Sequence, residues 1–533
     1  MHSLSSYFSA AYLGLFLPAS LALYRVMPQR GRRAVLLGMS FLFFWAVSGK
    51  LVIYLLFSIL SMHHMGLWLT DLQRSAAQAL EAAPKEERRA LRTASRRRQR
   101  QVLAFAVLLQ LGVLVGLKYS PFFAVNINSV FQLLHLSWQV EVPKLLLPMG
   151  ISFYTMQAMS YLFDVHRQKI QADRNLLRLA LYMSFFPQIM EGPICRYDQT
   201  APQLWSAPPI RRRNFALGVQ RCLFGLMKKI IVADRLNLFI QTVFTQYENY
   251  DGFVIALAAV SYTIQLYMDF SGTMDLAVGT GQIFGFQLPE NFRQPFFSKS
   301  ISEFWQRWHI TLGAWFKDYI FYPVSMSGPL KKLTGRARKR LGNHFGPLVA
   351  GTIALFLVWV CNGLWHGAAW SYLFFGMYHF ACILLANLTG PYTKALKRKL
   401  HISPTNKPYL VFQIVRTGIL VCIGELFFRA NGLRAGLEMF EKMIREFSLN
   451  SLADRTIFTI GMDKMDWLMV AAMLVVVFLV SLVRERGKPA GPRFWQTYIL
   501  PHYGLCCLML LAVILFGAYG YGYVPLDPIY AGF

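Results

Sequence analysis

The segment Cys361-Asn362-Gly363-Leu364-Trp365-His366-Gly367 lies between two runs, Gly346–Val360 and Ala368–Asn387, that are apolar enough to lie in lipid. A membrane helix rarely carries an ionisable side chain unless that side chain faces a cavity, a partner or a pathway. Imidazole exchanges a proton near neutral pH, so His366 is a candidate general base. The alternative is a buried structural histidine that is bonded to a backbone carbonyl. Local sequence leaves both interpretations open.

Composition predicts the class of protein. The 533 residues are 55% hydrophobic, 15% aromatic and 15% charged, and the mean hydropathy is +0.38. Apolar runs near the ~20 residues needed to cross a bilayer recur along the whole chain. We therefore expect one all-α polytopic membrane protein, with residues 1–533 forming a single integral membrane domain. The first apolar run follows no basic segment, so Met1–Val26 is interpreted as a spanning helix and not as a cleaved signal.

The net charge of +28 has an explanation that needs no nucleic acid. The basic residues gather in short loops between apolar runs, as the positive-inside rule predicts for cytoplasmic loops. The loop Asp71–Arg100 carries nine Lys or Arg against four Asp or Glu, and we expect it to be helical and to contact anionic lipid. The same rule places both termini outside.

Counting the apolar runs predicts about 11–13 membrane helices, of which some are broken or re-entrant. Leu179–Pro193 contains Pro187, which disfavours an uninterrupted helix. Phe253–Phe286 is too long for one straight crossing, and we expect it to break near Gly272. The remaining predicted spans are Phe8–Tyr24, Ala34–Val47, Leu51–Leu67, Val102–Leu117, Leu145–Phe163, Cys222–Phe244, Tyr409–Phe428, Trp467–Val483 and Ile499–Tyr519.

Two acidic residues, Asp269 and Asp275, lie within an apolar run with Ser271 between them. Acids at membrane depth normally have partners. They therefore either line a polar cavity or hold helices together, and the sequence does not decide between these roles.

The segment Ser300–Tyr322 has aromatic and aliphatic residues at helical spacing and charged residues between them. Such a two-faced, Trp-rich segment more often lies along the interface or dips partly into the membrane than crosses it, and we expect it to be a broken, partial helix. His309 lies in its middle, and this setting makes it a second candidate for proton chemistry. His379 lacks comparable flanks and is interpreted as a packed or interfacial side chain.

Several common functional classes lose support because their motifs are absent. The chain has no Walker loop, no HExxH and no GxSxG elbow. Its seven cysteines form no disulfide or metal-ligand spacing, so no structural metal is expected.

Two motifs together indicate a family: Ser302-Glu303-Phe304-Trp305-Gln306-Arg307-Trp308-His309, continued by Trp315-Phe316-Lys317-Asp318-Tyr319, and Gly363-Leu364-Trp365-His366-Gly367. With these motifs the chain resembles the membrane-bound O-acyltransferases, in particular the bacterial branch that acetylates alginate or D-alanylates teichoic acid. The resemblance covers about residues 147–430. Supporting matches are Pro148–Phe153, Phe186–Gln188, Gly192–Ile194, Asp269–Gly272, Phe427–Ala430 and Asp527–Tyr530.

The resemblance implies roles for particular residues. His366 matches the family's principal catalytic histidine, and His309 matches the second signature histidine, with an assisting or positioning role. Trp305, Arg307, Trp308, Asp318 and Trp365 belong to the same two motifs; they either shape a substrate path or fix the local helices. The family fold is a ring of helices around a central funnel, so we expect the His366 ring to be reachable by solvent from one side and by a thioester from the other.

The function that the resemblance implies is O-acyl transfer, most simply of acetyl, from a cytoplasmic thioester to a hydroxyl of an exported cell-envelope polysaccharide. The donor would be acetyl-CoA or an acyl-carrier protein, with no bound cofactor, and a secreted or membrane relay partner could complete the transfer. The expected location is the bacterial cytoplasmic membrane. Two alternatives remain: D-alanyl transfer to teichoic acid, and a non-enzymatic transporter of a lipid-linked glycan.

Overall fold

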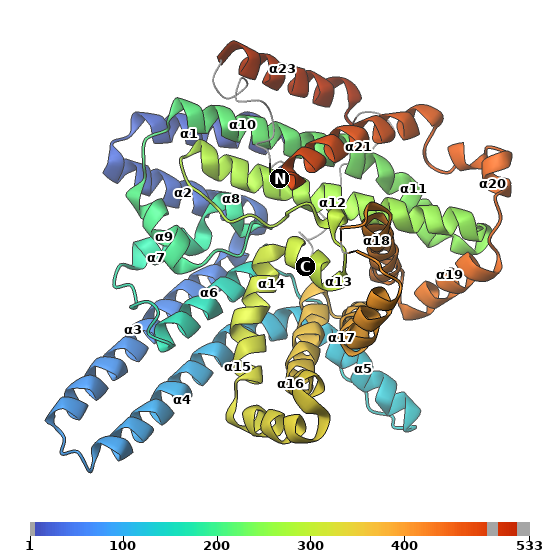
Figure 1. Cartoon of the computed structure of the whole chain (residues 1–533). Coiled ribbons are helices and arrows are strands. Elements are labelled where there is room, and N and C mark those ends of the chain that lie inside the picture. The colour runs from blue at the N-terminus through green and yellow to red at the C-terminus, as the bar shows by residue number, and fades with distance from the viewer. Residues whose placement is uncertain (1–5, 404, 488–498, 520–533) are drawn as a thin grey trace. The chain divides into compact units, whose positions relative to one another are not determined.

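The computed structural model describes residues 6–403, 405–487 and 499–519, which form helices joined by short loops (Figure 1). Within these ranges there is no β-strand, only an isolated antiparallel bridge between Phe292 and Trp308. The all-α prediction is therefore confirmed. The motif Asp527–Tyr530 lies outside the described residues.

The described chain divides into two compact units. Unit 1 holds the residues up to Gly218 together with Ala277–Pro289, and unit 2 holds Val219–Leu276 and the residues from Glu290 onward. The helices α10 (Arg212–Leu226) and α12 (Gly252–Ile283) contribute residues to both units. The division does not test the single-domain hypothesis, which stays a prediction.

The prediction of a polytopic membrane protein is confirmed. The described residues contain seven helical stretches that are long and apolar enough to cross a bilayer, and two shorter apolar helices, Tyr12–Val26 and Pro501–Phe516. One stretch includes both predicted spans Ala34–Val47 and Leu51–Leu67, so the number of stretches is not the number of crossings. The count of about 11–13 and the ring around a funnel stay predictions. The seven stretches are Gln29–Ala82, Arg88–Leu133, Gly252–Ile283, Gly328–His366, Trp370–Lys399, Lys407–Arg429 and Lys464–Glu485.

In unit 1 the predicted break within Leu179–Pro193 is confirmed, because α7 ends at Ser184 and the single turn α8 begins at Phe186. The interruption frees backbone groups that are costly to bury. At Phe186 these groups have partners: the Ser40 hydroxyl accepts from its N–H, and the Tyr7 hydroxyl donates to its carbonyl. Unit 1 contains η1 (Tyr12–Phe16), α1 (Leu17–Val26), α2 (Gln29–Ser48), η2 (Gly49–Leu51), α3 (Val52–Ala82), α4 (Arg88–Leu114), η3 (Val115–Tyr119), α5 (Ser120–Leu133), α6 (Ile151–His166), α7 (Leu176–Ser184), α8 (Phe186–Ile189) and α9 (Tyr197–Ser206).

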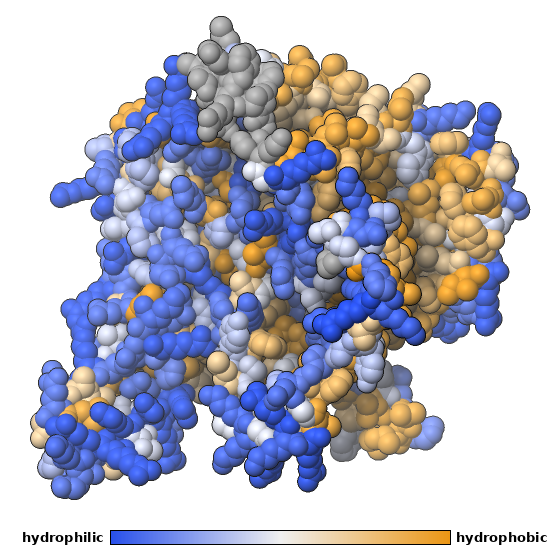
Figure 2. All heavy atoms as spheres, viewed as in Figure 1, coloured by the Kyte–Doolittle hydropathy of each residue, from blue (hydrophilic) through white to orange (hydrophobic). Residues whose placement is uncertain are grey.

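The basic segment Asp71–Arg100 is helical as predicted, because it forms the end of α3 and the beginning of α4. These helix ends are covered by hydrophilic side chains, as Figure 2 shows. In contrast, α6 is buried along almost its whole length and forms the core of unit 1 against α3, α4 and α7. The basic ends are therefore accessible to lipid headgroups or solvent.

Unit 2 combines apolar outer helices with a central set of short, broken helices. Apolar side chains gather over α21 and α23 in Figure 2, and residues such as Leu468 and Leu511 are more than half exposed, as expected for a surface that faces lipid. Unit 2 contains η4 (Met227–Ala233), α11 (Asp234–Thr245), η5 (Tyr247–Asn249), η6 (Pro295–Phe297), α13 (Ile301–Arg307), α14 (Ile310–Phe316), η7 (Lys317–Phe321), α15 (Tyr322–Ser325), α16 (Gly328–His366), α17 (Trp370–Lys399), α18 (Lys407–Arg429), α19 (Leu433–Arg445), α20 (Asn450–Ala453), η8 (Thr456–Phe458), α21 (Lys464–Glu485) and α23 (Ile499–Phe516).

One detail of the predicted helices is wrong. The helix α12 does not break near Gly272; instead, a Cβ added at Gly272 would lie 2.8 Å from the carbonyl oxygen of Gly225. This glycine therefore serves the close approach of two helices rather than a kink. The expectation that Ser300–Tyr322 is a broken segment is confirmed, because α13 ends at Arg307 and α14 begins at Ile310. The break falls at Trp308 and His309.

Candidate active site

The residue His366 is the last residue of α16, in unit 2. The helix packs against α17 so closely that a Cβ added at Gly363 would lie 2.6 Å from the carbonyl oxygen of Tyr372. A Cβ added at Gly376, on α17, would lie 2.5 Å from the carbonyl oxygen of Trp359. Only glycine fits at such distances, so these two residues fix how the helices pack and hence where the imidazole of His366 lies.

The His366 side chain is surrounded by aromatic rings and only 3% exposed. Its ring centroid lies 4.9 Å from that of Trp365, 5.1 Å from that of Phe428 and 5.9 Å from that of Phe375. The ring is thus nearly enclosed, and the expectation that it is reachable from two sides stays a prediction.

The second histidine, His309, lies at the break between α13 and α14 and has a positive φ of 48°. This left-handed conformation is uncommon outside glycine, although histidine is among the residues that adopt it more readily. A broken helix leaves backbone N–H and C=O groups without helical partners. The segment 291–293 supplies them, since the Asn291 carbonyl accepts from Ile310 N–H (3.0 Å) and Arg293 N–H donates to the Arg307 carbonyl (2.9 Å).

The amide side chain of Asn291 binds the backbone on the C-terminal side of His309. Its Oδ1 atom accepts hydrogen bonds from the backbone N–H of Thr311 (3.0 Å) and from the Thr311 hydroxyl (2.7 Å). Asn291 is itself buried, so water does not compete for these bonds. The backbone on both sides of His309 is thus fixed by one short segment that lies far from it in sequence.

The structure brings the two histidines together through one indole ring. The His309 side chain is 3% exposed, and its ring centroid lies 5.4 Å from that of Trp365 and 4.7 Å from that of Phe270. Because Trp365 also contacts His366, the centre of the site is a His–Trp–His group inside an aromatic shell. Such a shell excludes water from the imidazoles.

The other predicted site residues divide into two groups. Trp305 and Trp308 pack into the aromatic shell: Trp305 contacts Trp359 and Phe375, and Trp308 contacts Tyr267, Phe292 and Phe304. Arg307 and Asp318 form the second group. Arg307 forms ion pairs with Glu303 (2.6 Å) and Glu485 (2.7 Å), and Asp318 is exposed.

The residue His379 is packed, as predicted, and lies next to the same shell. It is fully buried, and its ring contacts Trp305, Trp359 and Phe375. Neither of its ring nitrogens has a hydrogen-bond partner within the described part of the chain. Since Phe375 contacts both His379 and His366, a third imidazole borders the site, which no local sequence pattern indicated.

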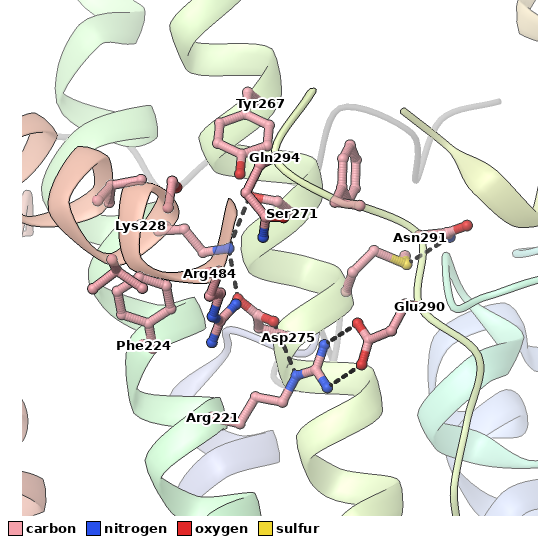
Figure 3. A pocket seen from close by; sticks show the side chains of 15 residues that line it. Arg221, Phe224, Lys228, Tyr267, Ser271, Asp275, Glu290, Asn291, Gln294 and Arg484 are labelled. Carbon is pink, nitrogen blue, oxygen red and sulfur yellow. Dashed lines mark hydrogen bonds and ion pairs between the residues drawn. The ribbon is translucent and has the colours of Figure 1, made fainter. Parts of the chain in front are cut away.

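The acids Asp269 and Asp275 both form ion pairs with lysines on another helix. They therefore hold helices together, which is one of the two roles that the sequence left open. Lys229 Nζ lies 2.6 Å from Asp269 Oδ1 and 2.8 Å from Asp234 Oδ1. Lys228 Nζ lies 2.6 Å from Asp275 Oδ2. Asp275 has both predicted roles, because it also lines a small cavity (Figure 3).

The sequence interpretation missed that both lysines are buried. They lie on η4, a turn of π-helix, a feature frequent at functional sites. A signal was present: two adjacent lysines stand within the apolar run Cys222–Phe244, where an unpaired charge would be costly. Among the described residues, no group of three His, Cys, Asp or Glu side chains is placed to hold a metal ion.

Comparisons with known proteins agree with the motifs at these positions. The sequence profile of the family described as MBOAT, membrane-bound O-acyltransferase, matches residues 149–337, a range that includes His309. A protein named probable alginate O-acetylase AlgI, from Azotobacter vinelandii, is 31% identical over 490 residues, which cover 91% of this chain and 86% of the relative. A peptidoglycan O-acetyltransferase from Helicobacter pylori is 29% identical and covers 64% of each chain. A teichoic acid D-alanyltransferase from Bacillus subtilis is 29% identical over 52% of this chain and 68% of the relative.

Proposed function

The chain belongs to the membrane-bound O-acyltransferase family, and from this premise we propose that it transfers an acetyl group from a cytoplasmic thioester to a hydroxyl of an exported polysaccharide. The extent of similarity supports acetyl as the group transferred. The relatives named as O-acetylating enzymes match 91% and 64% of the chain, whereas the D-alanyltransferase from Bacillus subtilis matches 52%. The names of these relatives support a polysaccharide as the acceptor class.

In the proposed reaction His366 is the general base. It takes the proton of the acceptor hydroxyl while the hydroxyl oxygen attacks the thioester carbonyl. The new C–O bond forms, the C–S bond breaks, and the proton leaves with the sulfur as a thiol. General base catalysis of this kind contributes typically ~100- to 10,000-fold in rate. The aromatic shell supports this role, because excluding water protects a thioester from hydrolysis.

In this proposal His309 assists His366, and Trp365 keeps the two rings in fixed relation. Contact of one indole with both imidazoles is the observation that carries the assignment. Since the His366 ring is buried, Phe375 or Phe428 moves aside when a substrate enters. Trp305 and Trp308 shape the shell, while Arg307 and Asp318 act further out, on the path of the donor.

The proposed donor is acetyl-CoA or an acyl-carrier protein, and the proposed location is the bacterial cytoplasmic membrane with both termini outside. This orientation puts the basic loops in the cytoplasm, where a thioester donor is available. A secreted or membrane partner that relays the acetyl group to the polymer fits the same scheme. No cofactor has a part in it.

Of the two alternatives, D-alanyl transfer to teichoic acid is still supported by a specific observation. D-alanyl transfer to teichoic acid would use the same histidines, and it is supported by similarity to the D-alanyltransferase from Bacillus subtilis. The transporter hypothesis loses its support, because membership of an acyltransferase family accounts for the buried histidines without it.

The test is the variant His366→Ala in the native host, with His64→Ala as the matched control because His64 is exposed on α3. We expect His366→Ala to lower polymer acylation by at least ~100-fold while the amount of exported polymer is unchanged. Mass spectrometry of the polymer distinguishes acetyl from D-alanyl. Normal acylation in His366→Ala would overturn the role of this residue, and lost export with intact acylation would restore the transporter.

A further inference from the structure

A polar cavity in unit 2 has no part in the chemistry described so far. It lies among η4, α12, α21 and the segment after α12, and Figure 3 shows charged side chains pointing into it. Its volume is about 40 Å³, and one water molecule needs roughly 10–15 Å³ on the same measure. The cavity therefore holds a few waters or one small ion.

The two acids of the cavity already have cationic partners. Asp275 is bound by Lys228 (2.6 Å) and by Arg221 (3.0 Å). Glu290 receives both terminal nitrogens of Arg221, at 2.7 and 2.6 Å, in a bidentate pair. A bidentate guanidinium–carboxylate pair of this kind is strong and geometrically fixed. Neither acid is left to attract a further cation.

A third cation is left over. Arg484, near the end of α21, lines the cavity, is exposed, and forms no ion pair with another described residue, while the neighbouring Glu485 binds Arg307. With Arg484, the cavity has three basic groups against two acids. Hydroxyl groups of Ser271 and Ser481 line it as well, and Ser271 already accepts from Lys228 (2.8 Å). A site with surplus positive charge and hydroxyl groups suits an anion with several acceptor oxygens.

We propose that this cavity is a subsite for a phosphate group. Arginine binds phosphate through two parallel N–H donors, and its guanidinium is only weakly hydrated. The size of the cavity admits a single tetrahedral oxyanion and not a larger polyanion. The basic segment around Arg484 lies on the predicted cytoplasmic side, where the donor arrives.

The source of the phosphate follows from the proposed function, on which this step rests. Both candidate donors, CoA and a carrier protein, present their thiol on a phosphopantetheine arm. The subsite binds the phosphate of that arm. A phospholipid headgroup has the same chemistry, so the experiment separates the two sources.

The experiment measures binding to the purified full-length protein in detergent, without any acyl transfer. The first probe pair is 4′-phosphopantetheine and pantetheine, which differ only in the phosphate. The second pair is dihexanoyl phosphatidylglycerol and dihexanoylglycerol. The variants are Arg484→Gln, Arg484→Lys and Ser481→Asp. The control is Arg486→Gln, because Arg486 is exposed like Arg484 but does not line the cavity.

We expect wild type and Arg486→Gln to bind 4′-phosphopantetheine about tenfold more tightly than pantetheine, in line with one charge-assisted contact. Arg484→Gln and Ser481→Asp lose this preference, and Arg484→Lys keeps part of it. If the phosphatidylglycerol pair alone shows the Arg484-dependent preference, the subsite stands and its phosphate comes from lipid. If neither pair depends on Arg484 or on Ser481→Asp, the proposal is overturned. His366→Ala keeps the preference whatever its activity, so failure of the catalytic assignment is distinguishable.

Discussion

Two buried regions of unit 2 solve the problem of polar groups in a membrane protein in opposite ways. Around His309 and His366 the neighbours are aromatic rings, whereas around Lys228 and Lys229 every neighbouring acid forms an ion pair. An imidazole is tolerated among rings because it can be uncharged, while a buried ammonium needs a counter-charge. The imidazoles of the aromatic region can therefore exchange a proton, whereas the ion pairs of the other region hold helices together.

The largest effect is expected where the ion-pair region is broken. Lys229→Met removes a 2%-exposed cation and leaves Asp234 and Asp269 without it. Breaking a buried pair from one side costs about 3–5 kcal/mol. We expect a large fall in the apparent unfolding temperature of the detergent-solubilised protein. Arg434→Ala, which removes an exposed ion pair with Glu438, is the control and leaves that temperature unchanged.

The outcome also tests the reading of this region as structural. If Asn replaces both Asp234 and Asp269 in the Lys229→Met protein, most of the loss should be recovered, because no unpaired charge remains. A Lys229→Met protein that is as stable as wild type would show that the ion pairs do not hold the helices.

An intermediate effect is expected where the aromatic region depends on close helix packing. Gly363→Ala places a methyl group 2.6 Å from the Tyr372 carbonyl oxygen, so α16 and α17 must separate. Overpacking costs typically ~1–3 kcal/mol, and acylation falls further than stability because His366 is displaced. Gly351→Ala, on the same helix but with open space around its Cβ position, is the matched control.

Acylation and thermal unfolding measured on both glycine variants decide this prediction. The control should be as active as wild type. Equal losses in Gly363→Ala and Gly351→Ala would contradict the role of the contact between α16 and α17, because alanine by itself favours a helix more than glycine does.

The smallest effect is expected at Arg307, whose pair with Glu485 joins α13 to α21 and whose pair with Glu303 lies within α13. A partly exposed ion pair contributes about 0–1 kcal/mol, so Arg307→Lys should barely change the unfolding temperature. If Arg307 also lies on the donor path, Arg307→Lys raises KM for the donor while kcat is kept. An unchanged KM would leave this arginine with its structural role alone.

Much of the fold follows from local sequence, and the errors have a common physical cause. Apolar length predicts the helices around Leu51–Leu67 and Tyr409–Phe428, and Pro187 predicts the interrupted α7–α8 segment. Ser300–Tyr322 was expected to be broken, but the position of the break at His309 was not predicted, because the groups that replace its helical hydrogen bonds come from Asn291 and Arg293, on a separate segment. Local periodicity contains no information about such a partner.

The candidate site shows the same limit. The two histidine motifs predict that His309 and His366 belong to the site, but their contact through Trp365 depends on the packing of α13, α14 and α16. Lys228 and Lys229 are visible in the sequence as charges within an apolar run. Their partners Asp269 and Asp275 could not be predicted, because they lie on another helix. Gly272 was assigned a kink because the sequence does not show that Gly225 lies against it.

The positive φ of His309 affects how this position should be mutated. Alanine removes the imidazole and also disfavours the left-handed backbone, so an alanine variant mixes two losses. Asparagine and glycine both accept that backbone. At His309, then, the choice of replacement residue determines whether an experiment reports on proton chemistry or on the shape of the turn.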